Sequence, residues 1–262
     1  MPDPLAGLAA PAWLEGAVAV RRLAAGPVSD SWRLSTPERD VVLRRDRPLA
    51  VVLGLDRARE ARALRIAHHH GLAPEPLFAD PDRGVLVTAW VGDAGPGASQ
   101  VRTGPVSWPG LGALLRRVHG LPVDGIAPLD LPSVARRYAR AAGSDEARAL
   151  ARRVTERSPA LFAGAPPRLC HNDAHTGNVV AGPQPLLLDW EYAATGHPLF
   201  DLAAVAGFHG LDAAATTALL DGWRGATPPA ETRAFPAFLD LYRAVARLWA
   251  LAVAAAAPPA DG

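Results

Sequence analysis

Two short polar segments hold the residues most able to do chemistry. The first contains Asp173 and, five residues later, Asn178; the second contains Asp189, which follows the apolar run 186–188. Carboxylate and carboxamide oxygens suit Mg²⁺, an ion that usually also binds substrate phosphates. A carboxylate left off the metal can accept the proton of a hydroxyl group. These side chains therefore indicate phosphoryl transfer, in which a metal neutralises the phosphates and a base orients the nucleophile.

The first segment leaves two other interpretations open. His171, Asp173 and His175 stand at alternate positions, so a strand would place them on one face as ligands of a metal-dependent hydrolase. No further His-rich ligand motif supports such a site, and we expect both His side chains to brace the loop instead. A polar turn without function is the simplest alternative.

Composition restricts the class of protein. The 262 residues are 49% hydrophobic and 20% charged, which is typical of a globular chain with one large domain or two lobes. All 27 basic residues are Arg, which excludes a P-loop or Schiff-base lysine. With 26 acidic residues the net charge is +1, and we expect no nucleic-acid partner. The single Cys170 excludes a disulfide framework and a zinc site made of several thiolates.

No segment indicates a membrane protein or a secreted one. The first residues lack the basic stretch of a secretory signal, and the apolar run 248–257 is too short to span a bilayer. We expect a cytoplasmic protein without a membrane partner, present as a monomer or a weak dimer.

The first ninety residues predict a small sheet with one helix. Alternating apolar residues indicate strands, and Gly, Pro and Asp mark the turns, including one over residues 24–30. Asp56 suits the N-cap of the helix, and Gly71 suits its end. The expected strands cover residues 15–20, 31–35, 41–45, 76–79 and 85–91.

Helical periodicity dominates after a turn-rich boundary at residues 92–97, interrupted by one short strand at 185–188. We therefore expect an α+β fold of two lobes, a sheet lobe over residues 1–91 and a larger helical lobe over residues 92–262. The expected helices include residues 111–119, 133–142 and 145–157.

Longer motifs surround the reactive residues. Residues 171–178 read His-Asn-Asp-Ala-His-Thr-Gly-Asn, with the spacing of the protein-kinase catalytic loop. Residues 189–193 read Asp-Trp-Glu-Tyr-Ala, and residues 196–203 fit the pattern G-x-P-x-x-D-L-A. Together these motifs resemble those of the aminoglycoside phosphotransferase and choline kinase family, whose loop typically reads H-x-D-x-H-x-G-N.

The resemblance implies a two-lobed, protein-kinase-like fold and a kinase that uses ATP and Mg²⁺ to phosphorylate a hydroxyl of a small molecule. On the family pattern, Asp173 is the catalytic base, and Asn178 and Asp189 bind Mg²⁺. Asp201 is expected to accept hydrogen bonds from the catalytic loop. The residues expected to support the centre are His171, His175, Glu191 and Asp201.

The nucleotide-binding side matches the family less closely. The turn that contains Ser29 and Asp30 resembles the family's nucleotide-covering turn, but it lacks the repeated glycines of protein kinases. The backbone of residues 88–91, including Ala89 and Val91, would receive the adenine.

The third-strand Lys of most kinases is absent, so the resemblance requires an Arg to bind the α- and β-phosphates of ATP. Arg44 directly follows the apolar residues 41–43, as in the family pattern, and Arg45 is the alternative. Glu60 falls on the helix that supplies the acidic partner of this base.

Within the family, the short chain and the D-W-E-Y-A motif look most like bacterial choline, ethanolamine or thiamine kinases. An aminoglycoside kinase is the alternative acceptor class, and a nucleotide-binding protein without turnover is the alternative of another kind. Trp223, Tyr242 and Trp249 could hold a cationic acceptor through cation–π contacts, or could be ordinary core residues.

Overall fold

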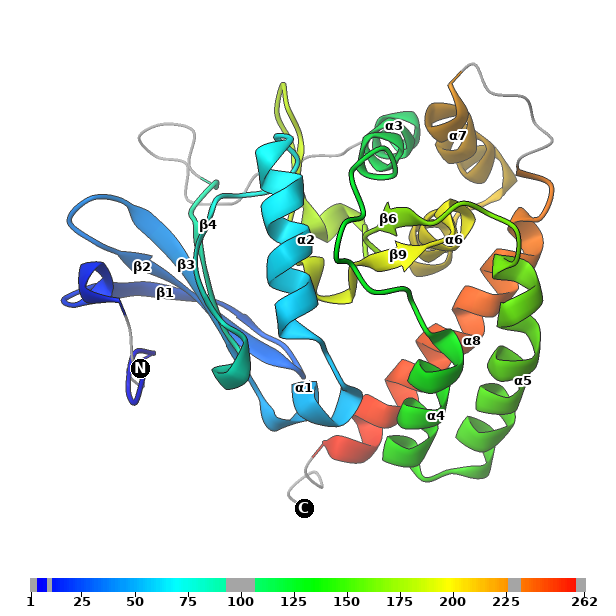
Figure 1. Cartoon of the computed structure of the whole chain (residues 1–262), viewed down its shortest axis with the longest axis horizontal. Helices are drawn as coiled ribbons and strands as arrows, with labels where there is room; N and C mark the ends of the chain where they lie inside the picture. The colour runs from blue at the N-terminus through cyan, green and yellow to red at the C-terminus, as the bar shows by residue number, and fades with distance from the viewer. Residues whose placement is uncertain (1–3, 9–10, 93–106, 226–231, 258–262) are drawn as a thin grey trace.

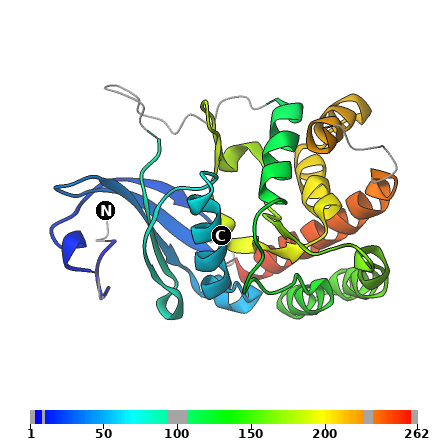
Figure 2. The ribbon, with the colours of Figure 1, turned by 45° about the horizontal axis from the view of Figure 1, so that its top comes forward.

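The computed structural model describes residues 4–8, 11–92, 107–225 and 232–257. It confirms the α+β fold: a five-stranded antiparallel sheet comes first, and a mainly helical part follows (Figure 1). Helix α2 (Arg57–His69) lies between the sheet and the helical part in both views (Figure 1, Figure 2).

The sheet follows the apolar alternation of its sequence. Its strands lie in the order β1-β2-β3-β5-β4. Val41 and Leu43 of β3 are fully buried, and Leu43 pairs with Trp32 on one side and with Val87 on the other. The strands are β1 (Val18–Ala25), β2 (Ser29–Ser35), β3 (Asp40–Asp46), β4 (Pro76–Asp80) and β5 (Val85–Ala89).

The turn before β2 is shorter than the sequence predicts. Ser29 and Asp30 are strand residues that pair with Asp46 and Arg45 of β3. The NH of Gly26 donates to the carbonyl of Ser29 at 2.9 Å, which closes a tight turn and lets pairing begin at once. The prediction of a turn over residues 24–30 is therefore wrong at both ends, because Ala24 and Ala25 belong to β1 and Ser29 and Asp30 to β2.

The sheet part contains two helices rather than one. The predicted helix is α2, and its cap is confirmed because the carboxylate of Asp56 accepts the NH of Arg59 at 2.9 Å. The second helix is α1 (Pro48–Leu53), which has Pro at its first turn and ends at Gly54 with φ 70°. Six mostly apolar residues without a polar N-cap are too few to show helical periodicity.

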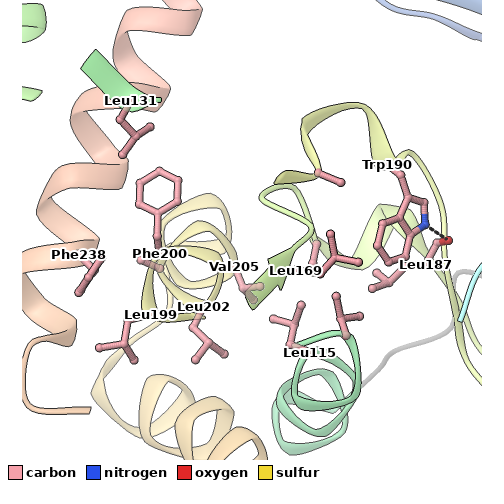
Figure 3. Packing of buried hydrophobic residues seen from close by; sticks show 14 of the residues in the cluster. Leu115, Leu131, Leu169, Leu187, Trp190, Leu199, Phe200, Leu202, Val205 and Phe238 are labelled. Carbon is pink, nitrogen blue, oxygen red and sulfur yellow. Dashed lines mark hydrogen bonds between the residues drawn. The ribbon is translucent and has the colours of Figure 1, made fainter. Parts of the chain in front are cut away.

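Helix α6 (Pro198–His209) forms the centre of the helical part. It is apolar on nearly every side and buried along most of its length. Phe200 lies on the side of Phe238 in α8, whereas Val205 lies toward Leu169 (Figure 3). The surrounding helices are α3 (Trp108–Val118), α4 (Leu131–Ala142), α5 (Asp145–Phe162), α7 (Ala213–Arg224) and α8 (Phe235–Ala256).

Two short strand pairs hold the polar segments in place. Strand β6 (Arg168–Cys170) pairs with β9 (Ala194–Gly196), and β7 (Val179–Val180) pairs with β8 (Leu186–Leu187), which is the strand predicted at 185–188. Residues 171–178 therefore leave one pair and enter the other. Short 3₁₀ turns complete the description: η1 (Ala12–Leu14), η2 (Pro81–Arg83), η3 (Thr176–Asn178) and η4 (Trp190–Tyr192).

The predicted boundary at residues 92–97 lies outside the described residues from Asp93 onward, so the division at residue 91 stays a prediction. Among the helices that the structure describes, none combines the length and apolar character needed to cross a membrane.

Candidate active site

A cleft of about 1130 Å³ is lined by residues of both the sheet and the helical part. Helix α2 and the two polar segments contribute to its inner wall, and α4 and α8 contribute to its far end. Asp30, His171 and Asp201 lie outside its lining. The predicted site residues that line it are Ser29, Arg44, Glu60, Ala89, Val91, Asp173, His175, Asn178, Asp189 and Glu191.

Asp201 fixes the start of the polar segment 171–178. Its carboxylate accepts the backbone NH groups of His171 and Asn172, each at 2.8 Å, which is the contact predicted for it. The side chain is completely buried. Burial alone would raise the pKa of Asp201, but the hydrogen bond from His119 and the backbone NH of His171 hold it below its usual value.

His119 and Trp223 extend this anchor to α3 and α7, and sequence reasoning missed His119. The indole NH of Trp223 donates to Nδ1 of His119 at 2.8 Å, so a neutral His119 carries its proton on Nε2 and donates it to Asp201 at 3.0 Å. Trp223 therefore serves this network, and it lies outside the cleft lining. Cys170 is nearby, but the ring nitrogens of His119 are already bonded, so this buried cluster offers no site for a metal.

Both ring nitrogens of His171 are occupied. Its Nε2 donates to the carbonyl of Leu188 at 2.9 Å, and its Nδ1 accepts the NH of Asp173 at 3.3 Å. Burial lowers the pKa of His171 and keeps the ring neutral. His171 thus links the two polar segments and is not free to bind a metal, which removes the three-ligand hydrolase site.

His175 shapes the other end of the segment. Its Nδ1 accepts the NH of Gly177 at 3.0 Å, and its ring stacks on Phe208 with 4.3 Å between centroids. Burial, with smaller contributions from His209 and His171, lowers the pKa of His175 to about 4. The ring is therefore a neutral brace at physiological pH.

Asn178 is tied directly to Asp173. Its amide nitrogen donates to the Asp173 carbonyl at 3.0 Å and to the Asp173 carboxylate at 3.2 Å. These bonds use the amide hydrogens and leave the amide oxygen of Asn178 as an acceptor or a metal ligand.

Three carboxyl groups crowd the floor of the cleft. Burial raises the pKa of Asp173 to about 8, and the charges of Asp189 and Glu191 add to the effect. Burial and the charge of Asp189 raise the pKa of Glu191 to about 7. Burial also raises the pKa of Asp189, although Arg44 donates to its carboxylate at 3.2 Å. With Asp46 and Glu60, five carboxyl groups share the two guanidinium groups of Arg44 and Arg57, so their full ionisation would leave excess negative charge unless a further cation joined them.

The backbone is strained beside these carboxyl groups. In the described part of the chain, only Asn172 (φ 64°) and Asp189 (φ 58°) are non-glycine residues with positive φ. Asn and Asp tolerate this conformation better than most residues, but it still costs free energy. Such strain is often found at functional sites, where it aims a side chain.

Arg44 forms the opposite wall together with Glu60. Both terminal nitrogens of Arg44 donate to the Glu60 carboxylate at 2.5 Å, and one of them also reaches Asp189. Arg45 points elsewhere and donates to the carbonyls of Pro4 and Ala6. Arg44, rather than Arg45, is therefore the third-strand base that faces the cleft.

Arg57 completes the wall, and sequence reasoning missed it. Its guanidinium donates to Asp46 at 2.7 and 2.8 Å, to Glu60 at 2.8 Å and to Glu191 at 2.9 Å. The spacing of three residues from Glu60 on α2 was a visible signal, but Glu191 is 134 residues away in sequence. Arg57 thus joins α2 and β3 to the second polar segment.

Two backbone NH groups at the edge of the cleft near β5 already form hydrogen bonds within the sheet part. The NH of Ala89 donates to the carbonyl of Glu75 at 2.9 Å, and the NH of Trp90 donates to the carbonyl of Asp40 at 3.1 Å. These two NH groups are therefore not available for a base. Asp30 is likewise engaged, because its carboxylate accepts from Arg22 and Arg47.

The donors on the floor fit a hard divalent cation. Asp189 and Asn178 supply the carboxylate and carboxamide oxygens that Mg²⁺ prefers, and the excess negative charge favours a cation there. No thiolate or free imidazole competes among the described residues that line the cleft, apart from His175, whose Nδ1 is bonded.

A model of the phosphotransferase enzyme family (APH) matches residues 19–253. The chain belongs to this family. This finding confirms the resemblance of the polar motifs and makes the chain an enzyme, a phosphotransferase. The match spans the sheet, the cleft and nearly all of α8, so it includes every residue described above as part of the site.

Three solved structures with a similar fold are named as phosphotransferases of small molecules. Choline kinase LicA from Streptococcus pneumoniae is 16% identical, with a TM-score of 0.72 over 91% of this phosphotransferase and 86% of its own chain. Ethanolamine kinase from Plasmodium vivax is 14% identical, with a TM-score of 0.72 over 94% and 79%. Spectinomycin phosphotransferase APH(9)-Ia, with ADP and spectinomycin bound, is 15% identical, with a TM-score of 0.57 over 89% and 80%. These likenesses confirm the kinase-like fold.

LicA has also been solved in complex with AMP. No curated protein matches the sequence of this phosphotransferase.

Proposed function

We propose that this phosphotransferase uses Mg²⁺ and ATP to phosphorylate a hydroxyl group of a small molecule. The observation that carries the proposal is the crowding of Asp173, Asp189 and Glu191 on one floor of the cleft, opposite Arg44. Excess negative charge beside a fixed guanidinium suits a metal ion and the phosphates that it binds. The complexes of related folds with AMP and with ADP are consistent with a nucleotide in this cleft.

Each residue has a distinct role in this proposal. Asp173 accepts the proton of the acceptor hydroxyl. The hydroxyl oxygen of the acceptor bonds to the γ-phosphorus of ATP, the bond between that phosphorus and the β–γ bridging oxygen breaks, and ADP leaves. Asn178 and Asp189 would hold Mg²⁺, which would neutralise charge on the phosphates. Arg44, positioned by Glu60, binds the α- and β-phosphates through its planar fork. Residues 1–91 then form the nucleotide-binding lobe, and residues 92–262 contain the catalytic segment and the acceptor site.

The adenine side of the proposal involves Ser29, Ala89 and Val91, which all line the cleft; Ser29 pairs with the Asp46 end of β3, and Ala89 pairs with Val41 near its other end. Because the NH of Ala89 is used within the sheet, its carbonyl and the backbone of Val91 are the groups left to meet a base. Asp30 contributes indirectly here, by fixing β2 through its contacts with Arg22 and Arg47.

The acceptor is best described as an amino alcohol or thiamine. Eight Phe, Tyr and Trp side chains line the described cleft, and four of them are considered for the acceptor; the indole NH of Trp249 donates to the hydroxyl of Tyr192 at 3.0 Å. Aromatic faces attract ammonium groups. Tyr242 and Trp249 line the cleft, which is consistent with the predicted contact of their rings with a cationic acceptor, whereas Trp223 lies outside the cleft lining. The four residues are Tyr138, Tyr192, Tyr242 and Trp249.

An aminoglycoside is the alternative acceptor. Such a polycation calls for several carboxylates away from the reacting atoms. The acidic residues among the described cleft lining are Glu60, Asp173, Asp189 and Glu191, and all of them belong to the reaction centre. This distribution favours a smaller acceptor.

A screen for ATP-dependent phosphorylation tests the proposal. Amino alcohols, thiamine, sugars and aminoglycosides are each supplied with Mg²⁺ and ATP, and the phosphorylated product is detected by ³¹P NMR with Asp173→Ala as the blank. We expect one class to be turned over by the wild type alone. Tight binding of Mg²⁺–ADP with no phosphorylated alcohol in any class would instead support a nucleotide-binding protein without turnover.

A further inference from the structure

Three arginines that line the cleft, Arg21, Arg59 and Arg243, have no carboxylate partner among the described residues, and Arg21 lies over the Trp90 ring instead. By contrast, the terminal nitrogens of Arg44 and Arg57 donate to carboxylates, and the exposed Arg247 of α8 is paired with Glu146. Arg59 and Arg243 are therefore the cleft cations of α2 and α8 that neither a carboxylate nor an aromatic ring engages in the described part of the chain.

Arg59 is the more telling of the two because it is half-buried. Its Nε is buried without a hydrogen-bond partner, and no bond from its terminal nitrogens is formed within the described part of the chain. Burial lowers the pKa of Arg59, against the smaller opposing effects of Asp56, Tyr138 and Glu60. Keeping a cation in this position without a counter-charge costs free energy, which a bound anion would recover.

Arg59 of α2, Tyr138 of α4 and Asp173 all line the same cleft. The pKa of Tyr138 is raised by burial and by Glu191, and it responds to Arg59 and to Asp173 as well. Because such influences fade with distance, the tyrosine ring lies within range of both groups. An acceptor whose hydroxyl reaches Asp173 would thus extend along Tyr138 toward Arg59.

We propose that the acceptor alcohol carries a carboxylate or phosphate group, which Arg59 binds while the hydroxyl meets Asp173. Arg243, exposed on the wall formed by α8, adds positive charge to the same part of the cleft. The inference rests on the proposed phosphotransfer to an alcohol and narrows its acceptor class. A hydroxy amino acid would satisfy both features, with its ammonium on the aromatic wall and its carboxylate on Arg59.

Matched pairs of acceptors test the inference, because each pair differs only in the anionic group. For the carboxylate the pairs are ethanolamine and serine, and 3-aminopropanol and homoserine; for the phosphate the pair is glycerol and glycerol 3-phosphate. The wild type should favour the anionic member of at least one pair by about 10- to 100-fold in kcat/KM, the contribution expected of one charged hydrogen-bonded contact. The pair that shows the preference identifies the anion.

Arg59→Met supplies the matched variant, since methionine keeps an unbranched side chain and a good helix propensity. It should abolish the preference through the acceptor KM, leave the ATP KM unchanged, and leave Tm equal or higher because an unpaired buried charge is removed. Arg65→Met, an exposed residue of the same helix, should retain the preference.

Three results would overturn the inference. One is a wild type that turns over alcohols without favouring any anionic member, and another is a preference that survives in Arg59→Met. The third is an increase in the ATP KM of Arg59→Met with the acceptor KM unchanged, which would place Arg59 on the nucleotide. Absence of turnover on every alcohol would overturn the proposed function itself, and this inference with it.

Discussion

The two sides of the cleft treat buried charge in opposite ways. On the wall made by β3 and α2, Glu60 accepts from Arg44 and Arg57, and these cations hold the pKa of Glu60 below its usual value against the effect of burial. On the floor, burial and mutual repulsion raise the pKa of Asp173 to about 8 and that of Glu191 to about 7. The charges of the wall are paired with one another, whereas the carboxyl groups of the floor repel one another.

This difference in charge pairing indicates different roles: the paired residues of the wall fix the shape of the cleft, and the crowded carboxyl groups of the floor suit the binding of a cation. A buried, fully paired network adds little net stability, but it fixes the positions of its members. A crowded set of carboxylates is unfavourable until a cation joins it, and such perturbed groups are typical of functional sites. Arg44 belongs to both sides, because it pairs with Glu60 and also reaches Asp189.

The largest effect is expected on the floor, from Asp173→Asn. The amide keeps the shape of the side chain but cannot accept the acceptor's proton, so turnover should fall by about 10²–10⁴. Nucleotide affinity should stay within a few-fold, because the carboxylate contacts the acceptor. Single-turnover rates and calorimetric ADP binding measure the two quantities. A variant that keeps more than a tenth of the wild-type rate would remove Asp173 from the base role.

On the wall, Arg44→Met should lower the free energy of unfolding and weaken ATP binding. Removing one partner of a buried ion pair costs about 3–5 kcal/mol, and Arg57 still pairs with Glu60, so we expect about 3 kcal/mol. For a chain of this size that corresponds to a Tm about 6–12 °C lower. The ATP KM should rise as well.

Arg45→Met is the matched control for Arg44→Met. Its guanidinium donates to backbone carbonyls of the N-terminal residues and lies away from the cleft. We expect a change of no more than about 0.5 kcal/mol in the free energy of unfolding and an unchanged ATP KM. Equal effects of the two variants, measured by thermal melts and ATP kinetics, would contradict the distinction between them.

The smallest effect concerns His175, which braces the floor as a neutral ring. Its pKa is about 4 in the folded state, below its value in the unfolded chain, so the unfolded state binds more protons between those values. The stability that depends on His175 is therefore complete above about pH 6.5 and declines as the pH falls toward 4. His175→Gln should flatten the dependence of Tm on pH in this window. An unchanged slope would show that His175 does not titrate as described.

The sequence predicted the parts of the site that are local. Residues 171–178 and Asp189 carry their chemistry in fixed spacings, and the Asp56 cap announces α2, so these features could be inferred without a structure. The α1 helix could not, because six apolar residues begun by proline show no period.

Contacts between distant segments were beyond sequence reasoning. Arg57 contacts Glu191, 134 residues away in sequence, and His119 contacts Asp201, 82 residues away. No sequence pattern around any of these residues predicts its partner. The assignment of Asp30 to the nucleotide illustrates the same limit. Its neighbours in sequence suggested a covering turn, whereas its carboxylate holds Arg22 and Arg47 in place.

We expect Mg²⁺ and the nucleotide to bind together on the floor of the cleft, with Asp189 as a ligand of the metal. Calorimetric titration of ADP with and without Mg²⁺, on the wild type and on Asp189→Asn, tests it directly. Mg²⁺ should increase the affinity of the wild type for ADP by at least about tenfold, which is the free energy of one charge-assisted contact. It should increase the affinity of Asp189→Asn for ADP far less. Equal Mg²⁺ dependence in the two proteins would contradict the claim.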